Sequence, residues 1–281
     1  MQDAFAHCAE LVRTGDHDRF ISTLFAPVEH RDALYALHAF NVEVARVREV
    51  AREPLPGEIR LQWWRDVVNG ERAGEASASP VAAALRSIME RHQLDAARFN
   101  ALIDAHRFDL YDEPMARLAD LEAYGRNTSS ALIVVAAQIL AGSDADAMWP
   151  AAEPAGIAYA IAAVLRAFPL HAARRQLYAP IELLSRHGVQ PQDIFAGRSS
   201  AGLNEAFAEL RGVARQHLLA AYRQVAALPR AALPAFLPVA LVRPSLDLLA
   251  GRDALAPAGI SPWRRQWLIW RAARNPARIA G

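Results

Sequence analysis

Asn41, Ala45 and Glu49 are spaced at i, i+4 and i+8, so that on a helix their side chains share one face. Carboxylate oxygens presented at this spacing are suited to hold a hard cation such as Mg²⁺. Glu49 supplies one carboxylate, whereas the methyl group of Ala45 supplies no ligand. The face therefore presents an amide, a methyl group and one carboxylate at helical spacing.

A helix over residues 35–53 is expected to position this face, because no Gly or Pro interrupts the stretch and Pro54 ends it. Its apolar stripe recurs at helical spacing through Leu37, Phe40, Val44 and Val47. Two i,i+3 ion pairs are expected along it, namely Glu43–Arg46 and Glu49–Arg52.

The remainder of the chain is also predicted to be helical. A helix over residues 5–25 is expected to break at 14–16, and Pro27 is expected to begin the helix that leads into residues 35–53. Further helices are predicted after Pro56 up to Gly70, and at 81–95, 97–111, 121–142, 156–189 and 201–228. No fixed-period repeat or low-complexity linker divides the chain, so one domain over residues 1–281 is expected.

The composition indicates a protein with a large, alanine-rich helical core. The chain has 281 residues, of which 53% are hydrophobic and 8% aromatic. No uninterrupted apolar run reaches the roughly 18 residues that span a bilayer, and the N-terminus lacks the order of a secretory signal. The single Cys8 excludes an internal disulfide, so a reducing, cytoplasmic location is expected.

The last quarter of the chain is strongly basic. Residues 211–281 carry a balance of +9 and the remainder −8, although the whole chain is only +1. Within a C-terminal tail over 261–281, indole rings at i, i+4 and i+7 alternate with guanidinium groups, and the side chains concerned are Trp263, Arg264, Arg265, Trp267, Trp270 and Arg271. This pattern fits a helix in a membrane interface, and it equally fits a tail docked on the body of the protein.

The segment HAFNVEVARVRE resembles the first aspartate-rich helix of the squalene/phytoene synthase family, which is close to YAFCRxxDDxxD. In that family two Asp four residues apart hold the Mg²⁺ ions that bind a prenyl diphosphate. Aligned without gaps, these two positions fall on Ala45 and Glu49 of this chain. Just upstream, Arg31 matches a family Arg, whereas the diphosphate-binding Ser-Phe is replaced by Arg19-Phe20.

The segment 156–189 resembles the second aspartate-rich helix of the same family. Arg166, Arg174 and Tyr178 fit its pattern, but the metal-binding Asn and the two Asp fall on Ala163, Ala167 and His171. Pro169 is expected to break the helix in the middle of the motif.

Shorter matches extend the resemblance over most of the chain. LIDAHRFDL places Asp109 on a family Asp, and WWRD places Trp64 on the Trp of AWRD, although Trp63 and Trp64 equally suit core and surface-anchor roles. Thr128, Ser129 and Ser130 correspond to a patch of small residues against which a substrate chain lies, and close helix packing explains the same residues better.

The resemblance implies an all-α, single-domain bundle of isoprenoid-synthase type around a central cavity. It implies that a remnant of the synthase site lines this cavity, comprising Asn41, Glu43, Arg46, Glu49, Asp109, Asn127, Arg166, His171, Arg174, Arg175 and Tyr178. No catalytic residue and no metal ligand set are assigned. Because alanine is no ligand and neutral histidine a poor one for Mg²⁺, no cofactor is expected unless the chain is a divergent active enzyme.

Segments such as FNVEVARV and LRAFPLHAARRQLYAP resemble a narrower branch, the synthase-like assembly factors of respiratory complex I. This resemblance favours a non-catalytic accessory or assembly factor for a membrane respiratory complex, peripheral on the inner face of the cytoplasmic membrane. Its expected partners are a prenyl chain or other lipid in the cavity and a membrane surface or a subunit of the complex. The alternatives are a divergent, Mg-dependent prenyl-diphosphate synthase of squalene/phytoene type, whose acids would include Asp104, and a membrane-surface binding module. No nucleic-acid motif accompanies the basic tail, and no P-loop, G-x-G-x-x-G, H-E-x-x-H or nucleophile-elbow motif is present.

Overall fold

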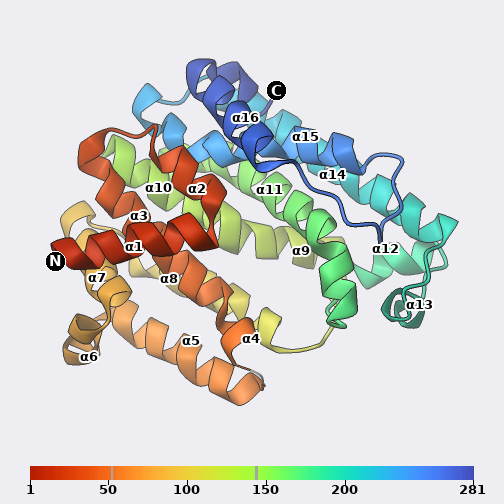
Figure 1. Cartoon of the computed structure of the whole chain (residues 1–281), viewed down its shortest axis with the longest axis horizontal. Coiled ribbons are helices and arrows are strands. Elements are labelled where there is room, and N and C mark those ends of the chain that lie inside the picture. Colours follow the sequence, from red (N-terminus) through yellow and green to blue (C-terminus); the bar gives the residue numbers. More distant parts are fainter. Residues whose placement is uncertain (52, 143–144) are drawn as a thin grey trace. The chain divides into compact units, whose positions relative to one another are not determined.

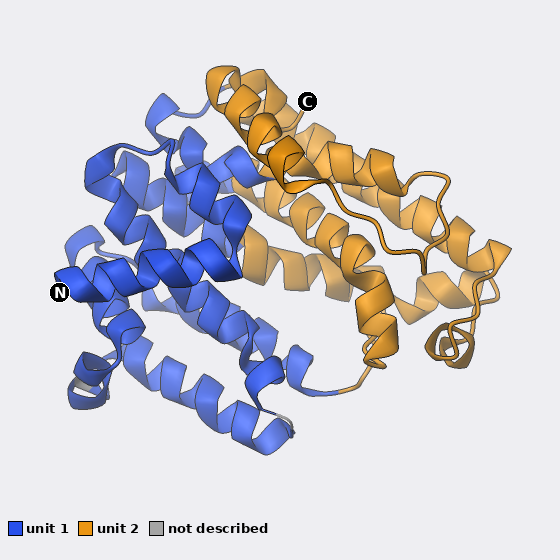
Figure 2. Ribbon diagram, viewed as in Figure 1, with its two compact units in different colours: residues 1–111, 131–149, 227–238 blue, residues 112–130, 150–226, 239–281 orange. Residues whose placement is uncertain are grey.

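The computed structural model describes residues 1–51, 53–142 and 145–281, and within these ranges the regular structure is helical without any strand. Residues 1–111, 131–149 and 227–238 form one compact unit, and residues 112–130, 150–226 and 239–281 form a second (Figure 2). We call them unit 1 and unit 2. The all-α class expected from the sequence is confirmed, and the single domain over residues 1–281 stays a prediction.

Unit 1 contains the N-terminal helices and one later helix (Figure 1). Its elements are α1 (Gln2–Gly15), α2 (His17–Thr23), α3 (Val28–Ala45), α4 (Val47–Val50), α5 (Pro54–Asn69), α6 (Ala73–Ala78), α7 (Pro80–His92), α8 (Ala96–His106), the 3₁₀ turn η1 (Phe108–Leu110) and α10 (Ala131–Ala141). The predicted break at 14–16, the start after Pro27 and the end at Gly70 are confirmed.

Unit 2 contains most of the C-terminal half. Its elements are α9 (Leu118–Gly125), the π turn η2 (Arg126–Ser130), α12 (Ile181–Arg186), α13 (Pro191–Phe195), α14 (Ala201–Val225), α15 (Val242–Leu249), α16 (Pro262–Arg274) and the 3₁₀ turn η4 (Pro276–Arg278). Helix α11 (Ala145–Ala173) and the 3₁₀ helix η3 (Arg230–Leu241) begin in unit 1 and continue into unit 2.

Helix α3 is the centre of unit 1. Every side chain from Ala33 to Phe40 is buried, and the helix contacts α1, α7, α8 and α10. Phe40 packs edge-on against Trp64 of α5 and Phe99 of α8, with ring centroids 5.1 and 5.5 Å apart. A helix that is apolar on all sides is stable only when neighbours surround it, so this packing fixes where α3 lies.

The predicted helix over 35–53 is shorter than expected, because α3 ends at Ala45 and Arg46 leaves helical geometry before α4 begins. Glu43 forms its ion pair with Arg60 of α5, at 2.7 Å, instead of with Arg46. Arg46 lies 3.7 Å from Glu49. A local i,i+3 pair contributes roughly a few tenths of a kcal/mol, which a partner on another helix readily replaces. The predicted Glu49–Arg52 pair lies outside the described residues.

Helix α11 corrects a second prediction, because it continues through Pro150, Pro154 and Pro169 to Ala173. The expected break at Pro169 is therefore wrong. A proline inside a helix removes a backbone hydrogen bond, and the buried side chains of Phe168 and Ala172 beside it hold this part of the helix in the core of the protein.

Two helical stretches, 146–173 and 230–249, are long and apolar enough to cross a membrane by length and composition. They contain scattered polar residues, which is why counting uninterrupted apolar runs did not find them. The larger part of an apolar 18-residue window in each stretch is buried inside the protein, as in the core helix of a globular domain.

Glycines let α11 approach η2 closely within unit 2. A Cβ atom added at Gly156 would lie 2.3 Å from the backbone nitrogen of Ser130, and one at Gly125 would lie 3.2 Å from the Cα of Ile157. Ser130 is fully buried, and its hydroxyl donates to the carbonyl of Glu153 at 2.8 Å. The small residues of this patch thus serve helix packing.

We expect Gly156→Ala to lower the free energy of unfolding by about 1–3 kcal/mol, because the new methyl group meets backbone that cannot rotate away. Gly212→Ala is the matched control, since nothing lies within 4 Å of its added Cβ, and it should stabilise helix α14 by roughly 0.5–1 kcal/mol. Urea unfolding measures both, and an equally stable Gly156→Ala variant would contradict the close packing.

Candidate functional site

The candidate residues of the first motif lie in unit 1, around the end of α3. Asn41 and Glu43 are half-buried on α3, whereas Arg46 and Glu49 are exposed beyond its end. Because α3 stops at Ala45, Glu49 belongs to the separate helix α4. The face of three residues predicted from i, i+4 and i+8 spacing is therefore interrupted at its centre.

Arginine side chains pair with the carboxylates of this first half. Glu43 Oε2 lies 2.7 Å from Arg60, and Glu49 lies 3.7 Å from Arg46. A carboxylate that already faces a guanidinium group has less negative potential to offer a metal ion. The partner of Glu43 was predicted wrongly from the sequence, because Arg60 belongs to another helix.

Asp109 is buried in η1, where its Oδ2 lies 2.6 Å from Nδ1 of His106. Both side chains are more than nine-tenths buried, which gives the pair a structural role at the end of α8. Asp104, the further acid considered for an active enzyme, forms an ion pair with Arg65. The two acids are thus engaged within unit 1.

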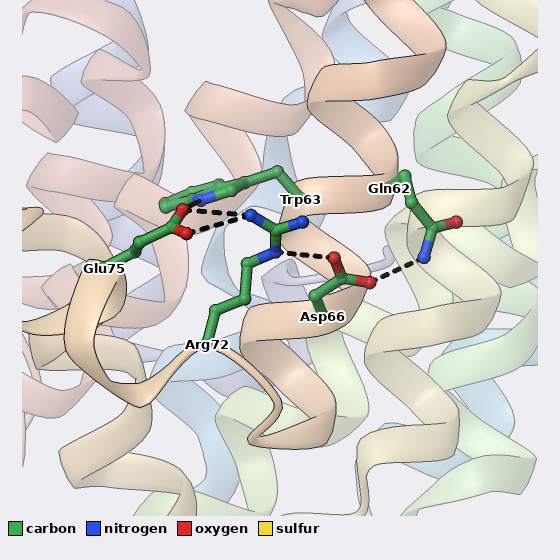
Figure 3. A network of polar contacts seen from close by, with 5 residues as sticks. All are labelled: Gln62, Trp63, Asp66, Arg72 and Glu75. Atoms are coloured by element: carbon green, nitrogen blue, oxygen red, sulfur yellow. Dashed lines mark hydrogen bonds and ion pairs between the residues drawn. The ribbon is translucent and has the colours of Figure 1, made fainter.

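The WWRD motif builds a polar network that joins α5 to α6 (Figure 3). Arg72 donates to Asp66 at 2.8 Å and to Glu75 at 3.0 Å, and Gln62 donates to Asp66 at 2.6 Å. The hydrogen bond from Arg72 and, to a smaller extent, that from Gln62 lower the pKa of Asp66. Trp63 Nε1 donates to Glu75 at 3.1 Å. The i,i+4 spacing of Gln62 and Asp66 was the one sequence signal for this network.

Trp64, which the resemblance aligned with a family Trp, is fully buried and belongs to the core. Its Nε1 has no hydrogen-bond partner within the described part of the chain. The core role expected for this tryptophan pair is confirmed for Trp64, whereas Trp63 is half-buried and donates to Glu75.

Arg19-Phe20, at the position of the family's Ser-Phe, serves the packing of unit 1. Arg19 Nη1 donates to Asp16 at 2.5 Å, and the Phe20 ring stacks on Tyr35 with centroids 5.5 Å apart. Burial opposes the charge on Asp16, but the charge and hydrogen bonds of Arg19 outweigh it and lower the pKa of that carboxyl group.

His38 of α3 is buried near this ion pair. Burial, assisted by the charge of Arg19, lowers the pKa of His38 to about 3, so the imidazole is neutral at pH 7. Its Nδ1 finds no hydrogen-bond partner among the residues that the structure describes. Sequence reasoning missed His38, whose burial follows from the apolar neighbours around it on α3.

The candidate residues of the second motif lie in unit 2. Asn127 is exposed on η2, Arg166 and His171 are half-buried on α11, and Tyr178 is buried after the helix ends. The rings of His171 and Tyr178 lie 4.6 Å apart. The ring centroids of Tyr178 and Tyr124 of α9 lie 5.8 Å apart, and the sequence did not indicate this aromatic neighbour.

Arg174 and Arg175 follow α11 in an exposed turn. Arg175 adopts a left-handed backbone conformation with φ of 59°. Its guanidinium group lies over the ring of Phe195 of α13, 4.9 Å from the centroid. This backbone conformation is unfavourable for a residue with a Cβ atom.

Ala163, Ala167 and His171 do share a face, because α11 is continuous over the whole motif. Two methyl groups and an imidazole therefore occupy positions where the family has an amide and two carboxylates. Within the described ranges, no group of three or more His, Cys, Asp or Glu side chains is arranged to hold a metal ion. The donor set does not fit Mg²⁺.

The C-terminal helix α16 docks through one face and exposes another. Ile269 and Ala272 are buried, whereas Trp263, Trp267 and Trp270 are 71%, 45% and 43% exposed. Arg271 and Arg274 lie over two of these rings, at 4.2 and 4.6 Å from the centroids. Both features predicted for the tail, docking and an exposed indole stripe, are therefore present in one helix; contact with a membrane stays a prediction.

Comparison with known proteins identifies the relatives of the chain. The family model described as squalene/phytoene synthase matches residues 12–271. An assembly factor 6 of NADH dehydrogenase (ubiquinone) complex I from Rattus norvegicus is 32% identical to the chain, over 84% of this chain and 70% of that protein.

Two solved structures share the fold. A squalene synthase HpnC from Alicyclobacillus acidocaldarius superposes with a TM-score of 0.75 at 21% identity, covering 87% of this chain and 92% of that one. A dehydrosqualene synthase in complex with ligand superposes with a TM-score of 0.83 at 16% identity, covering 96% and 95%. The isoprenoid-synthase fold expected from the sequence is confirmed.

The buried imidazole of His38 should make stability depend on pH. The unfolded chain takes up a proton below about pH 6.5, whereas folded His38 does so only near pH 3. Stability should therefore fall as pH falls through this interval, by about 1.4 kcal/mol per pH unit from this group.

We expect His38→Gln to remove the contribution of this group to the slope in urea unfolding measured between about pH 6.5 and 5, where the carboxyl group of Asp16 is ionised in the folded and the unfolded protein. His7→Gln, at an exposed position, controls for loss of an imidazole as such. Parallel pH profiles for the wild type and His38→Gln would show that His38 is protonated in the folded protein.

Proposed function

The chain belongs to the squalene/phytoene synthase family, and from this premise we propose that it is a non-catalytic member that acts as an accessory or assembly factor for a membrane respiratory complex of the complex I type. The observation that carries the proposal is the chemistry of the two aspartate-rich positions. Ala45 stands in the first, and Ala163, Ala167 and His171 stand in the second.

Ionisation of an allylic diphosphate develops roughly three negative charges on the leaving group, and the reaction depends on their neutralisation by metal ions. Alanine methyl groups bind no metal. The acids considered for a divergent enzyme are Glu49, Asp109 and Asp104, which lie beside Arg46, His106 and Arg65 respectively. These partners argue against the alternative of a divergent prenyl-diphosphate synthase, which would need the same acids for Mg²⁺.

The names of the similar proteins support an assembly role. Proteins named as assembly factor 6 of NADH dehydrogenase (ubiquinone) complex I from rat and human are 32% and 31% identical to this chain. By analogy, this chain would meet a subunit of a membrane complex at the inner face of the cytoplasmic membrane. No cofactor is needed for such a role, and a prenyl chain or other lipid is the ligand that the remnant synthase site would accept.

We expect the purified protein to release no diphosphate from farnesyl or geranylgeranyl diphosphate in the presence of Mg²⁺, because the ligands that would hold the metal are absent. The assay measures inorganic diphosphate and extracted hydrocarbon products, with an active squalene synthase as the positive control. Mg²⁺-dependent turnover above the heat-inactivated protein would falsify the non-catalytic assignment.

We expect deletion of the gene to lower NADH oxidation by membranes of the source cells, and wild-type protein to restore it. Glu49→Gln should restore it equally, because an exposed carboxylate has no catalytic task in an assembly factor. The divergent-enzyme alternative predicts that Glu49→Gln fails to restore NADH oxidation, even when the variant is as abundant as the wild-type protein. Unchanged NADH oxidation after deletion would refute the assembly role.

A further inference from the structure

A groove in unit 2 gathers arginine side chains around a cavity of about 430 Å³. It lies among α15, α16 and η4. Figure 1 shows α15 and α16 near the C-terminus. Guanidinium groups from all three elements line the groove, namely those of Arg243, Arg264, Arg271 and Arg278. A volume of this size accommodates a small polar ligand.

The charge of the groove is unbalanced. Among the described residues that line it, Asp247 has the one carboxylate side chain. That carboxylate is shared, because it lies 3.1 Å from Arg215 and 4.0 Å from Arg243. The guanidinium groups of Arg264, Arg271 and Arg278 outnumber the backbone carboxylate of Gly281, which also lines the groove, so positive charge remains in excess. Guanidinium is the side-chain group best matched to phosphate oxygens.

The groove also lies beside the indole stripe of α16. With 100° between successive residues, Arg264, Leu268 and Arg271 cluster on one side of the helix. The indole stripe lies about 100° around the helix from this arginine side, and it consists of Trp263, Trp267 and Trp270. It lies opposite the buried side of the helix, which holds Ile269 and Ala272. Arg271 joins the two surfaces, because it lines the groove and its guanidinium group lies over Trp267.

We propose that this surface binds a bilayer that contains anionic phospholipid, with a lipid phosphate in the arginine groove and the three indole rings in the interfacial layer. The inference deepens the proposed function by making its membrane contact specific, and vesicle binding tests it separately from NADH oxidation. Indole rings favour the depth of the headgroups, and cationic residues beside them add attraction to anionic lipid.

The indole stripe decides between a membrane and a soluble phosphate compound as the occupant. A site for a free phosphate ester needs the arginines but gains nothing from three large aromatic rings exposed outside the groove. A bilayer uses both, because its phosphate layer and its interfacial region lie at neighbouring depths. On α16 the arginine side and the indole stripe are likewise adjacent, so each can meet its own layer of the bilayer.

The test is co-sedimentation of the full chain with vesicles of phosphatidylcholine alone or of phosphatidylcholine mixed with an equal part of phosphatidylglycerol. We expect binding to the mixed vesicles that weakens at high salt. Arg264→Gln with Arg278→Gln should reduce it roughly 25-fold, at roughly fivefold for each arginine near an anionic surface.

The matched control is Arg223→Gln with Arg252→Gln, which removes the same charge from exposed positions of unit 2 outside the groove and should reduce binding far less. Trp263→Ala, at the most exposed ring, should weaken binding to the mixed vesicles without unfolding the protein, as checked by circular dichroism. An equal loss of vesicle binding in the control and groove variants would show that the groove is not the site of the lipid phosphate. Absence of vesicle binding would overturn the membrane assignment, even if inorganic phosphate alone stabilised the protein.

Discussion

The burial of helix α3 is the constraint on which unit 1 depends. Its side chains from Ala33 to Phe40 are enclosed by α1, α7, α8 and α10, so the helix can lie in one position. Its C-terminal end, where half-buried Asn41 and exposed Ala45 lie, is held in place by this core. Packing and metal binding are therefore separable in this family fold, since the helix is fully positioned while one of its ligand positions holds a methyl group.

The same separation is visible in unit 2. Helix α11 is continuous past Pro169 and packs against η2 through Gly156, yet its motif face presents Ala163, Ala167 and His171. A fold of the isoprenoid-synthase type thus persists around residues that do not fit Mg²⁺. The exposed polar and aromatic groups that remain, on α16 above all, suit contact with a larger surface better than chemistry on a small molecule.

Local signals predicted the parts of the fold that depend on local chemistry. Pro27 begins α3 because proline is favoured where a helix starts, and Gly70 ends α5 because its φ of 83° suits glycine. The end of α3 at Ala45 and the pairing of Glu43 with Arg60 depend on a different helix, which helical periodicity does not register. The pairs of Asp109 with His106 and of Asp16 with Arg19 were missed for a related reason, because a family motif indicates ligands and is silent on which side chains enter the core.

We propose that this synthase fold, which lacks a carboxylate at Ala45, Ala167 and His171, binds no catalytic metal. Electron paramagnetic resonance of Mn²⁺, titrated with the protein in the presence of inorganic diphosphate, measures this most directly. The account predicts a spectrum equal to that of Mn²⁺ and diphosphate without protein, because Ala45, Ala163 and Ala167 supply no ligand. Saturable binding of Mn²⁺ by the protein, lost in Glu49→Gln, would contradict it.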